Sequence, residues 1–233
     1  MNVLGIDTST PASAACVLRH DGAVFEQEPP PTALTAPPRH ARELMPAIVK
    51  CLEESGLHFS ELDAIAVGAG PGTFTGLRIG VTTARALAHA WSIELRPVSS
   101  LAALAAGVIE PGATSHEAWA GGGPVLALID ASRGEVFAAL HEDGAQRWPP
   151  FAASPAAVAA RVAGAGLKPL AVGNGSVRFR DVLEAVGIRV APDGARAHAV
   201  RGLSICRLAS DVAPTPPEAV LPDYLRAPDA KPR

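Results

Sequence analysis

The sequence is poor in the residues that mark secreted proteins, thiolate metal sites and aromatic-rich binding surfaces. Among 233 residues there are three cysteines, 4% aromatic residues and 18% charged residues. Cys16, Cys51 and Cys206 are an odd number at wide spacings without a C-x-x-C pair, which argues against a disulfide framework and a zinc-thiolate site. Such cysteine usage is typical of a reducing compartment, so we expect a cytoplasmic protein with free thiols.

Charge and hydropathy exclude two further classes. The formal net charge is −3 and the pI is near 6.2, so the whole chain lacks the positive field that draws proteins to phosphate backbones. No run reaches the roughly 18 uncharged apolar residues of a membrane-spanning helix. Residues 1–7 also lack the cationic start of a signal peptide. We therefore expect no membrane association.

Apolar residues are abundant, at 48%, and the mean hydropathy is +0.21, which is enough for two compact lobes. Five prolines between residues 29 and 38 predict a surface loop. Pro46 predicts that the helix at 40–54 either begins near Leu44 or is kinked. The expected elements of the first half are strands at 3–6, 14–18, 23–25 and 64–68 and helices at 40–54 and 76–90.

The second half echoes the first. A strand at 125–130 ends in Asp130 and is followed by another strand at 135–140, as in residues 3–18. A further strand at 170–173 and helices near 176–186 and 199–211 are expected. The predicted division is a first lobe of 1–105, on which 199–233 pack back, and a smaller lobe of 106–198. The Gly-rich connection falls near 110–112 and 121–124.

Two segments are candidates for binding phosphate. Asp7 ends the first strand, and a carboxylate followed by hydroxyl residues there suits magnesium and nucleotide phosphates, although Asp7 could simply cap a turn. The Gly70–Gly72 loop precedes a helix whose N-terminus offers donors to an anion, but it matches neither a Walker A loop nor G-x-G-x-x-G. The candidate residues are Asp7, Thr8, Gly70, Gly72 and Thr73.

The helix that follows the loop carries a stripe of small residues, Gly76, Gly80, Ala84 and Ala88. The stripe is as consistent with close internal packing as with partner binding.

Several segments together resemble the bacterial TsaB family, which is also called YeaZ-type and glycoprotease-like. They are HARELMP at 40–46, LDAIAVG at 62–68, the loop at 70–80, PVSSL at 97–101, IDASRGEVFAAL at 129–140 and PDYLR at 222–226. The resemblance covers nearly the whole chain, and the proline-rich segment at 29–38 departs from it. It implies an α/β, actin-like (ribonuclease-H-like) fold in two lobes, each with a mixed sheet flanked by helices.

The resemblance also implies a non-catalytic role. The partner is TsaD, which transfers a threonylcarbamoyl group from its adenylate to adenosine 37 of tRNAs that read codons starting with A. In TsaD an H-x-x-x-H pair binds the catalytic metal, whereas Ser100 and Leu104 stand at the matching places here and cannot replace two imidazoles. We thus expect no metal and no required cofactor. TsaE, an ATPase, completes the complex. ATP or ADP is allowed at the partner interface, a homodimer is allowed for the chain alone, and tRNA contact is indirect.

In this family the first lobe's two helices form the partner surface. The candidates are Leu44, Ile48, Leu52, Gly80, Ala84 and Leu87, although apolar helix faces more often turn to their own core. His40 is expected to be a polar surface or capping residue, and Cys51 a packed thiol.

The alternative function is a small-molecule kinase or ATPase of the actin-like superfamily, with Asp7 near magnesium and the Gly70–Gly72 loop on phosphates. Such an enzyme also needs an adenosine pocket, at which only the segment 174–176 hints.

Overall fold

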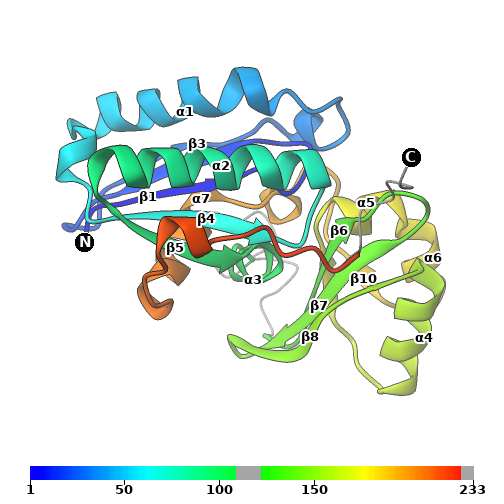
Figure 1. Cartoon of the computed structure of the whole chain (residues 1–233). Coiled ribbons are helices and arrows are strands. Elements are labelled where there is room, and N and C mark those ends of the chain that lie inside the picture. Colours follow the sequence, from blue (N-terminus) through cyan, green and yellow to red (C-terminus); the bar gives the residue numbers. More distant parts are fainter. Residues whose placement is uncertain (109–121, 227–233) are drawn as a thin grey trace.

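The computed structural model describes residues 1–108 and 122–226, and two five-stranded mixed sheets form its framework (Figure 1). The expected connection near 110–112 and the residue at 121 lie outside the described residues. The strands of the first sheet are β1 (Val3–Asp7), β2 (Ala14–Leu18), β3 (Val24–Gln27), β4 (Ala64–Gly70) and β5 (Glu94–Ser99). Those of the second are β6 (Val125–Asp130), β7 (Val136–Glu142), β8 (Ala145–Ala153), β9 (Leu170–Val172) and β10 (Arg189–Val190).

Both sheets have the same topology. The first has the order β3-β2-β1-β4-β5, in which β1 pairs antiparallel with β2 and parallel with β4. The second, read from its other edge, has the order β8-β7-β6-β9-β10, in which β6 pairs antiparallel with β7 and parallel with β9. The repeated strand pattern of the sequence therefore corresponds to a repeated topology, and the predicted two-lobe α/β fold of actin-like type is confirmed.

Helices cover the sheets in layers (Figure 1). The helices are α1 (His40–Ser55), α2 (Phe74–Trp91), α3 (Ser100–Ala106), α4 (Pro155–Gly164), α5 (Asn174–Arg178), α6 (Arg180–Glu184) and α7 (Gly202–Leu208). One face of the first sheet carries α1 and α2, and its other face carries α3 and α7. Because α3 also contacts β6 and β7, the layer it shares with α7 joins the two sheets.

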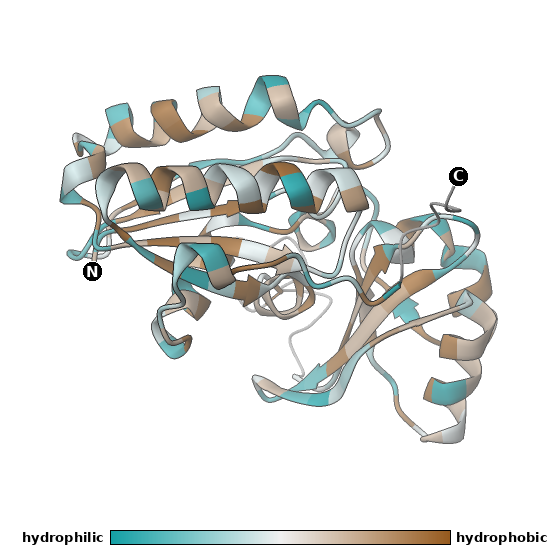
Figure 2. Cartoon of the chain, in the orientation of Figure 1, coloured by the Kyte–Doolittle hydropathy of each residue, from teal (hydrophilic) through white to brown (hydrophobic). Residues whose placement is uncertain are grey.

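The cores follow from this layering, and Figure 2 shows hydrophobic residues (brown) along the strands that the helices cover. All five residues of β1 are buried, as expected for a central strand covered on both faces. One apolar cluster fills the space between the first sheet and the pair α1 and α2, and another lies between the two sheets. A third lies under α4 and α6. Among the described residues no helix is long and apolar enough to cross a bilayer.

The helix predicted at 40–54 is confirmed as α1. Because α1 begins at His40 with Pro46 inside it, the alternative of a start near Leu44 is wrong, while the kink at Pro46 stays a prediction. Two predictions about other helices need correction. The helix expected at 176–186 is two short helices, because the backbone at Phe179 leaves the helical region, with φ −115° and ψ 28°. The helix expected at 199–211 is α7 followed by a 3-10 turn at 209–211. The predicted glycine cap of α1 is confirmed, since Gly56 is left-handed, with φ 68°.

Candidate functional site

Asp7 lies at the end of β1 and is enclosed by its own chain. Its side chain is 1% exposed, Oδ1 accepts hydrogen bonds from the amide of Ser9 at 2.8 Å and from Ser9 Oγ at 2.6 Å, and Oδ2 accepts one from Ser100 Oγ at 2.7 Å. Burial raises the pKa of the Asp7 carboxyl, and the hydrogen bonds from Ser9 and Ser100 offset only part of that rise. The carboxylate is thus an internal acceptor.

Replacing Asp7 with asparagine should make the protein more stable, relative to the native chain, at neutral pH than at acid pH. Because the folded-state pKa of Asp7 lies above its unfolded value, its stabilising contribution is complete below about pH 4 and is lost as the pH rises through the folded pKa. Asparagine does not titrate, so we expect the stability of Asp7→Asn relative to the native chain to rise as the pH goes from about 4 to about 8. Urea unfolding of both proteins across this range measures it. A variant that loses stability relative to the native chain with rising pH would show that the charge is needed.

The glycine loop packs on the turn that follows β1. The Thr73 amide donates to the Ser9 carbonyl at 2.8 Å, and Thr8 Oγ1 donates to the Gly76 carbonyl at 2.7 Å. A Cβ atom at Gly72 would lie 2.5 Å from Ser9. These contacts show that the glycines allow two backbone segments to touch.

The prediction that these residues cradle a phosphate therefore needs correction. Thr8 is fully buried, and the backbone of residues 8–9 fills the space against Gly72. The chain's tail covers Gly70, because the Asp223 amide donates to the Ala69 carbonyl at 2.7 Å. Thr73, by contrast, lines an open groove.

Helix α3 carries Ser100 and Leu104, which the resemblance to the TsaB family places at the metal-ligand positions of TsaD. Ser100 is fully buried and bonds Asp7, as described above. Leu104 is also fully buried, and it lies beside Gly173 of the second lobe. Across residues 1–108 and 122–226, no three His, Cys, Asp or Glu side chains are grouped as metal ligands would be. The position thus serves packing between the lobes.

A cavity between the lobes has its lining carboxylates held in ion pairs. It has a volume of about 600 Å³, and Pro31, Thr32 and Leu34 of the proline-rich segment form part of its wall. Two carboxylates line it, and both are paired: Asp130 with Arg178 and Asp193 with Arg180, each at 2.5 Å. Asn174 Oδ1 accepts from the Asp130 amide at 3.1 Å, so the segment at 174–176 that hinted at an adenosine pocket caps the turn after β6.

The partner surface predicted on α1 and α2 needs correction residue by residue. Leu44, Ile48, Leu52 and Ala84 are at most 5% exposed and belong to the core between these helices and the first sheet. Gly80 is buried against Thr8, and Leu87 is partly buried against the same core. The small-residue stripe of α2 is likewise buried, so it serves internal packing. The outward faces carry other residues, among them Met45, Val49, Thr75, Thr82 and Ala86.

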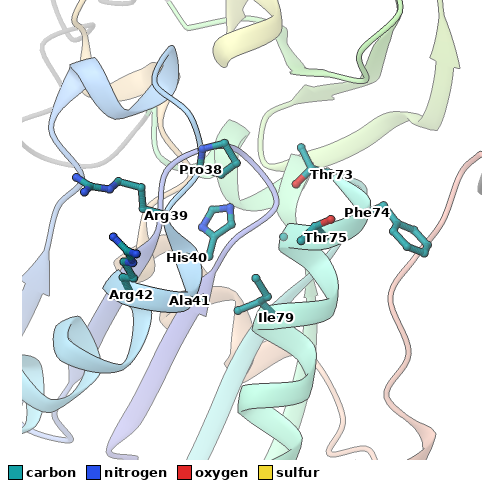
Figure 3. A pocket seen from close by; sticks show the side chains of 10 residues that line it. Pro38, Arg39, His40, Ala41, Arg42, Thr73, Phe74, Thr75 and Ile79 are labelled. Carbon is teal, nitrogen blue, oxygen red and sulfur yellow. The ribbon is translucent and has the colours of Figure 1, made fainter.

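A groove lies between the N-termini of α1 and α2 (Figure 3). Its volume is about 620 Å³, and Pro38–Arg42, Thr73–Gly76 and Ile79 line it. His40 is 3% exposed rather than at the surface as predicted, and its Nδ1 lies 2.8 Å from Ser13 Oγ. The spacing of His40, Leu44 and Ile48 along one face of the helix is the signal that predicts this burial.

Cys51 is a packed thiol as predicted, and burial raises its pKa to about 12.

Comparisons with known proteins identify relatives along the whole chain. The model of the family described as TsaD, tRNA N6-adenosine threonylcarbamoyltransferase, matches residues 34–223. The tRNA threonylcarbamoyladenosine biosynthesis protein TsaB of Escherichia coli (strain K12) is 35% identical over 147 residues, which cover 61% of this chain and 55% of that protein. A protein of Mycobacterium leprae (strain TN) is 33% identical over 243 residues, which cover 99% of this chain and 56% of that protein. The chain thus spans little more than half the length of these curated relatives.

A solved structure is similar over the full length. The crystal structure of a Pseudomonas aeruginosa protein described as similar to the peptidase YeaZ superposes with a TM-score of 0.77 at 29% identity, covering 97% of this chain and 99% of that one. The family match runs from just before α1 to beyond α7, so it takes in elements of both lobes. The chain belongs to the TsaD family of tRNA N6-adenosine threonylcarbamoyltransferases, and within it to the TsaB type, also known as YeaZ.

Proposed function

We propose that this chain is a non-catalytic partner of a TsaD enzyme in the formation of N6-threonylcarbamoyladenosine at position 37 of tRNAs that read codons starting with A. The observation that supports the proposal is that Ser100 and Leu104, which the resemblance places at the metal-ligand positions of TsaD, are both fully buried and engaged within the chain. Neither side chain supplies an imidazole. A chain with this family's fold but without its metal ligands is suited to bind the enzyme rather than to repeat its chemistry.

The outward faces of α1 and α2 support a partner role. Met45 and Val49 of α1 are 40% and 41% exposed, and Trp91 at the end of α2 is 48% exposed while it stacks on Phe59 at a centroid distance of 5.6 Å. Exposed aromatic and methionine side chains are enriched at protein interfaces. We place the TsaD contact on this face, and we expect a homodimer of the chain alone to use the same face.

The other members of the assembly follow from the same role. TsaE supplies ATP hydrolysis, and this chain requires no cofactor of its own, although ATP or ADP can lie at the partner interface. The tRNA contact is indirect, because a net charge of −3 gives the chain little general attraction to nucleic acid. The assembly acts in the cytoplasm.

The test is a mixing experiment with the TsaD enzyme of the same organism. Light scattering after size exclusion should show a one-to-one complex, and tRNA modification should require both proteins. Val49→Glu should weaken the complex at least tenfold, about 1.4 kcal/mol, because it buries a charge at the interface. Val182→Glu is the matched control, since Val182 is 39% exposed on α6 in the second lobe.

Two results would contradict the proposal. Modification of tRNA by this chain without the enzyme would show that it is itself a catalyst. Equal loss of binding for Val49→Glu and Val182→Glu would remove the interface from α1.

A further inference from the structure

The groove between α1 and α2 lies at the N-termini of both helices. Neither Arg39 nor Thr73, the residues that precede the two helices, makes a side-chain capping hydrogen bond. The first amide groups of a helix have no partner within it, and the helix dipole places partial positive charge at the same end. The helices have 16 and 18 residues, so both dipoles are developed. Their N-termini meet at one groove (Figure 3).

A buried histidine at the groove has a nitrogen without a partner. Ser13 Oγ holds Nδ1 of His40 at 2.8 Å, whereas Nε2 is buried and makes no hydrogen bond. His40 is 3% exposed, and its ring lies between the two helices in Figure 3. An unsatisfied buried polar atom costs free energy, which a ligand accepting a hydrogen bond would recover. This nitrogen is independent of the helix termini and indicates the same kind of ligand.

The charges around the groove favour an anion. Two arginines, Arg39 and Arg42, are among the lining residues, and none of the lining residues is acidic. In Figure 3 both arginine side chains point away from the groove, so they act through their field rather than by contact. Glu43 on the same helix is the carboxylate that acts on His40, while α2 presents Thr75, Gly76 and Ile79, which do not titrate.

We propose that this groove binds the phosphate group of a small molecule, with Nε2–H of His40 and the first amides of α1 and α2 as donors. The volume of about 620 Å³ falls within the range of about 300–1,000 Å³ for small-molecule sites. Helix N-termini are established binding places for phosphate. The proposal concerns the chain alone and does not depend on the TsaD partnership, so the two can fail separately.

Binding should act on the titration of His40. Burial lowers the pKa of its imidazole, and Glu43 and the Thr10 carbonyl oppose that effect only in part. A bound phosphate dianion stabilises the imidazolium, so the pKa of His40 should rise when the groove is filled, and binding should weaken as the pH rises through that value.

The experiment is a titration of the full chain with inorganic phosphate, with sodium chloride at matched ionic strength as the reference. Nitrogen-correlated NMR of the histidine rings reports on His40, whose signal is assigned with a His40→Gln variant. We expect a saturable shift with phosphate, no comparable shift with chloride, and a higher pKa of His40 in the saturated protein.

Two variants that each replace a threonine of α2 with glutamate distinguish a local effect at the groove from the general effect of an added negative charge on phosphate binding. Thr75→Glu puts a carboxylate in the first turn of α2, where an acid favours the helix, and we expect phosphate affinity to fall at least tenfold. Thr82→Glu adds the same charge two turns along the helix, at another exposed position, and should change the affinity less than twofold. Thermal unfolding confirms that both variants fold.

Three outcomes would overturn the proposal. The first is the absence of a saturable shift of His40 with phosphate, and the second is an equal loss of affinity in Thr75→Glu and Thr82→Glu. The third is stoichiometric displacement of phosphate by unmodified tRNA, since the groove would then bind a nucleic-acid backbone rather than a small molecule.

Discussion

Replacing Arg201 with methionine is expected to lower the free energy of unfolding by about 3–5 kcal/mol. The Arg201 and Glu26 side chains are 7% and 4% exposed and form an ion pair between β3 and the start of α7. Methionine keeps much of the side-chain volume but leaves the Glu26 carboxylate buried without its cation. The cost of an uncompensated buried charge is the reason for the large effect.

The Glu26 carboxylate also holds the helix that follows. Its Oε1 accepts a hydrogen bond from the Leu203 amide in the first turn of α7 at 3.0 Å. Glu28 adds a second carboxylate 3.3 Å from the Arg201 guanidinium and pairs with Arg196 at 2.9 Å. The network ties the C-terminal segment to the edge of the first sheet, so its loss should release α7 from β3.

Urea unfolding gives the free energies, and two controls define the cause. Arg147→Met removes a surface pair with Glu142, whose side chains are 45% and 34% exposed, and should cost at most about 1 kcal/mol. The double variant Glu26→Gln with Arg201→Met removes the charge, keeps an acceptor for the Leu203 amide, and should recover most of the loss. A double variant as unstable as Arg201→Met would show that the buried charge is not the cause.

Periodicity in the sequence predicted α1, α2 and the central strands, but the residues named for the partner surface on the basis of the resemblance lie on the inward faces of the two helices. The apolar residues of α1 and α2 recur at helical spacing because they pack on the first sheet, as the burial of Leu44 and Ile48 shows. A second, outward surface carries no such periodicity. Met45 and Val49 therefore could not be separated from ordinary exposed residues without knowing which face the sheet covers.

Contacts between distant parts of the chain were also beyond sequence reasoning. The Arg201–Glu26 pair joins residues 175 positions apart. The enclosure of Asp7 depends on Ser100, which is 93 positions away. By contrast, α4 was missed although it has a local signal: Ser154 caps it by accepting from the Ala157 amide at 3.3 Å, Pro155 is its first residue, and Val158 and Val162 are one turn apart.

Gly76→Ala is expected to lower the free energy of unfolding by about 1–3 kcal/mol, although alanine is the better helix former by about 1 kcal/mol. Gly76 lies in the first turn of α2, and its carbonyl accepts the hydrogen bond from Thr8 Oγ1 at 2.7 Å. A Cβ atom here would overlap the Thr8 carbonyl oxygen and would lie 2.5 Å from Thr73 Oγ1. Because Thr8 is held in the turn after the central strand, α2 would have to move away from that turn.

The sign of the effect distinguishes packing from intrinsic helix preference. Gly164 ends α4, and a Cβ atom there would meet no atom within 4 Å. Gly164→Ala should therefore leave the free energy of unfolding unchanged or raise it by up to about 1 kcal/mol, as helix propensity alone requires. If Gly76→Ala were stabilising to the same degree in urea unfolding, the loop and the Thr8 turn would not be in the close contact that excludes a phosphate between them.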